Sequence, residues 1–78
     1  MTRKVLDICI DGCHLECIHT ECKQNPFRVY LRDAGHRRQI AKYGDFVSVL
    51  YFLMDLYQSG ANRLTTSGVA MWAKGRNG

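Results

Sequence analysis

The sequence lacks the features that would assign it to several specialised classes of protein. Its four cysteines make up about 5% of the chain, below the roughly 8–10% typical of disulfide scaffolds. Its longest apolar run, residues 49–54, is far shorter than the roughly 20 residues of a membrane-spanning helix. Asp7 and Asp11 interrupt the apolar residues behind the basic N-terminus, which argues against a secretory signal peptide. We therefore expect a cytoplasmic protein with reduced thiols and no membrane association.

The chain also shows no internal repeat, no linker and no RRM, KH, zinc-finger or helix-turn-helix pattern. Its 78 residues, 46% hydrophobic and 23% charged, match one small globular domain. Such a short chain buries only about 60% of its unfolded surface, which argues against a self-contained enzyme. We expect one domain over residues 1–74, a frayed tail at 75–78, no cofactor and no catalytic residues.

A tight hairpin near the N-terminus is the clearest local prediction. Residues 4–10 and 13–20 alternate between apolar and polar, and Asp11-Gly12 between them favours a type I′ turn. A two-residue loop fixes the register, because a slip by one residue would exchange the two faces. The expected partners are Ile10 with Cys13, Cys9 with His14, Ile8 with Leu15, and Leu6 with Cys17.

A second hairpin is predicted between Pro26 and Gly44, with its turn at residues 33–36. Apolar and polar residues alternate on both sides of this turn, as in a half-buried sheet. Matching Arg32 with Arg37 keeps the apolar side chains together and completes the register. This register puts Val29 opposite Ile40 and assigns Ala41 to the polar face.

The segment after Gly44 predicts an apolar helix. Asp45 is a typical N-cap, residues 46–57 contain only two polar side chains, and Gly60 can end the helix. A helix on one sheet buries about half of its circumference, so this apolar arc is wider than required. The C-terminal segment with Val69, Met71 and Trp72, a second copy of the chain or another protein could cover the excess. The predicted protein interface comprises Val47, Tyr51, Phe52 and Leu56.

These elements predict a small α+β domain. A single-layer antiparallel sheet of about four strands in two hairpins would carry one apolar helix on one face. Residues 64–74 fit either an additional strand or a short helix.

Positive charge is concentrated in the second hairpin. Residues 23–43 carry a net charge of +5, whereas residues 1–22 and 44–60 carry −2 each and residues 61–78 carry +3. Arginines beside an aromatic ring suit phosphate contacts and base stacking, although the same residues can simply form a solvated polar face. The predicted site for an anionic partner comprises Arg28, Tyr30, Arg32, His36, Arg37, Arg38 and Lys42.

The cysteines and histidines form a weaker candidate for a zinc site. Their C-x3-C-x3-C-x4-C spacing does not give the two separated close pairs typical of structural zinc. The hairpin register also turns Cys9 and His14 away from Cys13 and Cys17. Cys9 and His14 could form a thiolate–imidazole pair, with Asp7 or Glu16 orienting the ring, but an open sheet face provides no pocket.

The predicted function is that of a non-catalytic binding module whose basic sheet face engages nucleic acid or a nucleoprotein. The first alternative is a protein-interaction or inhibitor protein, of the kind that phages and mobile elements carry, acting on a host protein or nuclease complex. The second alternative is a small structural zinc-binding domain with ligands that include Cys9 and His14.

Overall fold

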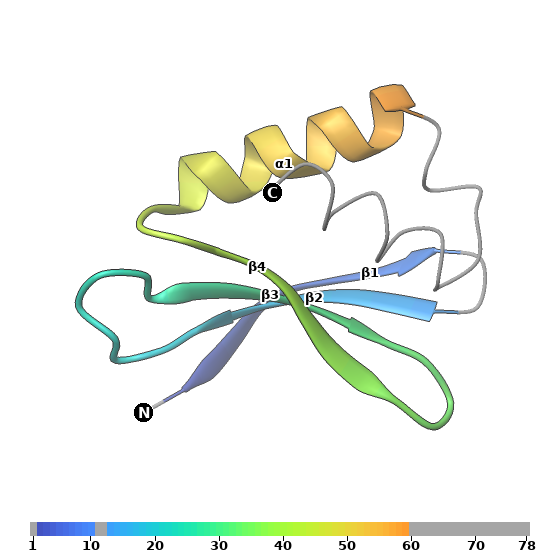
Figure 1. Cartoon of the computed structure of the whole chain (residues 1–78), viewed down its shortest axis with the longest axis horizontal. Coiled ribbons are helices and arrows are strands. Elements are labelled where there is room, and N and C mark those ends of the chain that lie inside the picture. Colours follow the sequence, from blue (N-terminus) through green and yellow to red (C-terminus); the bar gives the residue numbers. More distant parts are fainter. Residues whose placement is uncertain (1, 11–12, 60–78) are drawn as a thin grey trace.

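The structure, a computed structural model, describes residues 2–10 and 13–59, except for the side chain of Ile10. The predictions for Gly60, for residues 64–74 and for the tail lie outside the described residues. The elements are β1 (Arg3–Ile10), β2 (Cys13–His19), β3 (Phe27–Arg32), β4 (Arg37–Tyr43) and α1 (Phe46–Ser59). Figure 1 shows α1 lying across one face of a four-stranded antiparallel sheet with the order β1-β2-β3-β4. The predicted α+β fold is confirmed.

The register between β1 and β2 is the predicted one from Leu6 to Ile10. It shifts between Lys4 and Leu6, so Val5 forms an irregularity and Lys4 lies opposite Ile18. A bulge adds one residue to a strand and changes which side of the sheet the preceding side chains occupy. Lys4 therefore lies on the side of the sheet that faces away from the helix.

The sheet is continued by β3, which pairs with β2 across the loop of residues 20–26. Leu15 lies opposite Leu31 and Cys17 opposite Val29, so the apolar residues of the two hairpins form one surface. The backbone N–H of Thr20 donates to the carbonyl oxygen of Pro26 at 2.7 Å and closes the loop.

The predicted register between β3 and β4 is correct near the turn and wrong further along. Arg32 pairs with Arg37 as expected, but Val29 lies opposite Ala41 rather than Ile40. The cause is a register shift between Val29 and Tyr30, which leaves Ile40 as an extra residue in β4. Ala41 consequently belongs to the core, where it is only 7% exposed, and not to the polar face.

The helix begins where the sequence predicts. The backbone N–H of Ser48 donates to Asp45 Oδ1 at 2.8 Å, which makes Asp45 the N-cap and holds the pKa of its carboxyl below the usual range. The helix ends at Ser59, two residues later than predicted, because no residue before Gly60 interrupts it. Among the described helical residues, no segment is long and apolar enough to cross a bilayer.

The core lies between α1 and the sheet. Phe52 and Leu56 are fully buried there, against Leu15 and Leu31 of the central strands. The ring of Phe52 lies 6.0 Å from that of Tyr43 at the end of β4. The core residues are Cys13, Leu15, Cys17, Val29, Leu31, Ala41, Val49, Phe52, Leu53 and Leu56.

Candidate nucleic-acid interface

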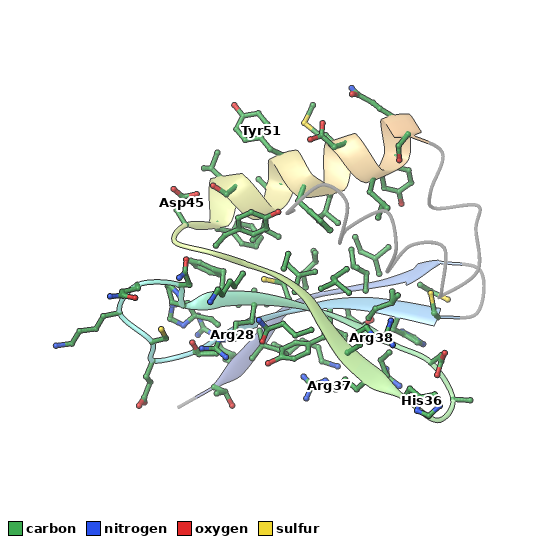
Figure 2. The ribbon with its side chains drawn as sticks, viewed as in Figure 1. Arg28, His36, Arg37, Arg38, Asp45 and Tyr51 are labelled. Carbon is green, nitrogen blue, oxygen red and sulfur yellow. The ribbon has the colours of Figure 1, made fainter. Side chains whose placement is uncertain are left out.

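The side of the sheet that faces away from α1 carries most of the predicted site. Alternation along the strands places polar side chains here, and Figure 2 shows Arg37 pointing away from the helix. We call this side the open face. Its side chains come from all four strands: Lys4, Asp7, Cys9, His14, Glu16, Ile18, Arg28, Tyr30, Arg32, Arg37, Gln39 and Lys42.

A buried carboxylate occupies the centre of the open face. Glu16 is only 3% exposed, although no helix or strand among the described residues packs over this side of the sheet. Lys4 Nζ contacts Glu16 Oε2, while the Nε atoms of Arg32 and Arg37 lie 3.3 and 3.5 Å from Oε1. The hydrogen bond from Lys4, supported by the two arginine charges, lowers the pKa of Glu16 despite its burial. Glu16 thus holds three cations from three other strands in one cluster.

Asp7 links this cluster to His14. Asp7 Oδ1 lies 2.9 Å from His14 Nδ1, and Asp7 Oδ2 accepts from Lys4 Nζ at 3.3 Å. The His14 contact is the main reason that the pKa of Asp7 lies below its usual range. Of the two carboxylates predicted to orient His14, the structure therefore selects Asp7.

The residues proposed for a zinc site or a thiolate–imidazole pair are divided between the two sides of the sheet. Cys9 is exposed opposite His14, whereas Cys13 and Cys17 are buried on the other side of the sheet. Within residues 2–10 and 13–59, no three His, Cys, Asp or Glu side chains come together in a group that could hold a metal ion.

Tyr30, the one Phe, Tyr or Trp among the described residues of the open face, is in contact with a cation. The Arg37 guanidinium carbon lies 4.2 Å from the centroid of Tyr30, in cation–π geometry. Arg37 therefore binds both Tyr30 and Glu16, which fixes its head group near the middle of the face. One face of the Tyr30 ring is consequently occupied and not free for base stacking.

Arg28 is held at the end of the open face nearest the 20–26 loop. The pKa of the Cys22 thiol is lowered by hydrogen bonds from the backbone N–H groups of Asn25 and Gln24, and by the Arg28 side chain. Arg28 is half-buried, and its Nε is buried without a hydrogen-bond partner. It is therefore less exposed to solvent than Arg37, whose side chain is 50% exposed.

Two residues of the predicted basic site lie elsewhere. His36 is at the exposed β3–β4 turn, which is closed by hydrogen bonds from the backbone N–H groups of Gly35 and His36 to Asp33 Oδ1. Arg38 lies opposite Leu31, whose side chain is in the core, so it belongs to the helix side of the sheet. The alternation of β4 separates it from Arg37, and its place on the basic face was wrongly predicted. Arg28, Tyr30, Arg32, Arg37 and Lys42 are all on the open face.

Sequence reasoning missed the two residues that complete the charge cluster. Glu16 could have been found by aligning the apolar residues of β2 and β3, since this alignment puts it opposite Tyr30 and between the arginines. Lys4 reaches the open face through the irregularity at Val5, for which the sequence offers no signal. With both included, the open face carries five Lys or Arg side chains and two carboxylates, and it remains positive.

The predicted helix interface is divided between core and surface. Val47 and Tyr51 are 57% and 61% exposed, as expected for an interface. Phe52 and Leu56 are fully buried against the sheet, because the helix turns these positions inward, and their assignment to a surface was wrong. The exposed apolar residues that the prediction missed are Leu50, Met54 and Tyr57.

Comparison of the chain with models of protein families, with curated proteins and with solved structures finds no match.

Proposed function

We propose that the open face binds the sugar–phosphate backbone of nucleic acid without strong sequence preference. The observation that carries the proposal is the cluster of cations around Glu16, in which Arg32 and Arg37 keep about half of their side-chain surface exposed. Phosphate contacts from arginine and lysine supply most of the affinity of sequence-independent binding. The open face keeps a net positive charge although it contains two carboxylates.

The geometry favours phosphate contacts over base recognition. Strands present their side chains as a flat array, and the single ring of Tyr30 is covered on one face by Arg37. Single-stranded nucleic acid is usually held by several exposed aromatic platforms, and the open face has one. We therefore expect little discrimination between sequences and a strong dependence on salt.

The test is a titration of fluorescently labelled DNA and RNA, duplex and single-stranded, over a range of salt concentrations. If three or four side chains contact phosphates, the logarithm of the binding constant should fall with the logarithm of salt concentration with a slope of about −3 to −4. Replacing Arg37 with Gln should weaken binding about tenfold at low salt and reduce the slope by about 1.

Arg38 provides a matched control, because it is the neighbour of Arg37 on the opposite side of β4. Arg38→Gln removes the same charge and should change affinity by less than about twofold at moderate salt. Equal losses in the two variants would show that net charge rather than the open face governs binding. No binding of any of the four nucleic acids at low salt would overturn the proposal.

A further inference from the structure

In the described part of the chain, the exposed large hydrophobic side chains all lie on the outer side of α1. Five large side chains point to solvent there, each between 44% and 61% exposed. Figure 2 shows Tyr51 on the side of the helix that faces away from the sheet. We call this surface the outer face: Val47, Leu50, Tyr51, Met54 and Tyr57.

The spacing of the outer face is that of a helix-pairing surface. Val47 and Met54 are seven residues apart, as are Leu50 and Tyr57, and Tyr51 widens the stripe. These are the a, d and e positions of two heptads, the pattern by which helices pack side by side. The inner side of α1 already has its own buried residues, so the helix carries two apolar surfaces.

The size of the outer face matches what a small dimer requires. With about 200 Å² for a large side chain, these exposures leave on the order of 500 Å² per copy. This is about a tenth of the 5104 Å² surface of the chain, the share that a specific interface typically occupies. If both outer faces were buried completely, two copies would remove at most roughly 1,000 Å² from water, the lower limit for a specific complex.

The chemistry of the outer face favours a second copy over a different protein. None of its five residues is charged, so no group on it selects a partner of opposite charge or repels an identical helix. An antiparallel pair places Val47 against the partner's Tyr57 and Leu50 against the partner's Met54. Each small or medium side chain then meets a longer one, and the helix dipoles oppose each other favourably.

We propose that the protein forms a twofold-symmetric homodimer in which the outer faces of two α1 helices pack antiparallel. Because the buried area is at the lower limit for specific complexes, the dissociation constant should be on the order of micromolar. This inference is independent of nucleic-acid binding.

Sedimentation equilibrium of the full chain without nucleic acid, from about 1 µM to about 1 mM, tests the proposal. The expected result is a concentration-dependent monomer–dimer equilibrium. Met54→Glu places a charge at the centre of the interface and should weaken dimerisation by about 100-fold or more. Since Met54 is 53% exposed, the variant should keep the circular dichroism spectrum of the folded chain.

Gln24→Glu is the matched control, because it makes the same charge change in the exposed loop between β2 and β3. It should dimerise like the unmodified chain. A chain that is monomeric throughout the concentration range would overturn the proposal, and so would a dimer that Met54→Glu leaves intact. Either result would leave the outer face to another occupant, such as the chain's own residues 60–78 or a different protein.

Discussion

The two sides of the sheet exclude water by different means. On one side, α1 supplies a second layer, and Phe52 and Leu56 are buried against Leu15 and Leu31. On the other side there is no second layer among the described residues, yet Glu16 is almost as deeply buried as the core. Cationic side chains from three other strands contact the Glu16 carboxylate there.

This difference shows what long cationic side chains contribute to a single-layer sheet. Lys4, Arg32 and Arg37 place their charged groups against Glu16 while 44%, 41% and 50% of their side-chain surface stays exposed, as long amphipathic side chains can. Their charges compensate the buried carboxylate, which by itself would be costly to remove from water. The open face is thus both a charged surface and a structural layer.

Thiol labelling should show the largest contrast between the two sides. Cys9 is exposed on the open face, whereas Cys17 is fully buried on the helix side, where burial also raises the pKa of its thiol. Cys17 should react only when the domain unfolds, at least about 1,000-fold more slowly than Cys9. Timed alkylation with mass spectrometry measures both rates. Equal rates in the native protein would contradict the assignment of the two sides, and similar rates in denaturant are the control.

Adjacent helix residues provide the next contrast. Phe52→Ala should lower the free energy of unfolding by about 3–5 kcal/mol, because it leaves a cavity between α1 and the sheet. Tyr51→Ala removes a ring of similar size from the outer face and should cost less than about 1 kcal/mol in dilute solution. Urea denaturation followed by circular dichroism measures both.

If Phe52→Ala fails to fold, Phe52→Leu can replace it in the comparison. This variant should lower the free energy of unfolding by about 1–2 kcal/mol. Similar losses for Phe52→Leu and Tyr51→Ala would show that the helix does not bury the side that the structure assigns to the core.

A smaller effect than that of Phe52→Ala is expected from removing the buried charge of the open face. Glu16→Gln keeps the shape of the side chain but removes the charge that attracts Lys4, Arg32 and Arg37, so unfolding should become easier by about 1–2 kcal/mol. Gln39→Glu, which adds a carboxylate to the same face, is the informative counterpart. It should partly restore the stability of the Glu16→Gln chain if charge compensation is the main contribution.

The pH dependence of the stability tests the same interaction of Glu16 with its cations. The pKa of Glu16 is lower in the folded chain than in the unfolded chain. Its contribution to stability is therefore complete above its unfolded pKa, about 4.3, and is lost as the pH falls through the lower folded value. Denaturation measured between neutral and acidic pH should show a smaller acid-dependent loss in Glu16→Gln. An identical profile in both chains would mean that Glu16 is not stabilised by its neighbours.

Local sequence signals predicted the elements because each has a short-range cause. The Asp-Gly signal at residues 11–12 predicted the pairing of Ile10 with Cys13, and Asp45 fixes the start of α1 through its bond to Ser48. The two bulges, at Val5 and Ile40, have no such signal, because they depend on how neighbouring strands fit together. The first brings Lys4 to the open face, and the second moves Ala41 into the core.

The candidate site was predicted in its composition but not in its organisation. Alternation correctly grouped Arg28, Arg32 and Arg37 with Tyr30. The role of Glu16 depends on the pairing of β2 with β3, which joins residues from two separate hairpins. A glutamate in an alternating strand suggests a solvated side chain, whereas in the fold three cations from three other strands contact the buried carboxylate of Glu16.

The position of α1 on the side opposite the open face determines how many nucleic-acid molecules the proposed dimer could engage. Helices packed against each other would turn the two basic surfaces in opposite directions, so the two subunits could not lie along neighbouring sites of one short duplex. The assembly would instead act as a bivalent cross-linker that joins two separate segments. Because dimerisation depends on protein concentration, the number of nucleic-acid sites per assembly would depend on it too. The same would hold for the capacity to bring distant stretches of one long nucleic acid together in a loop.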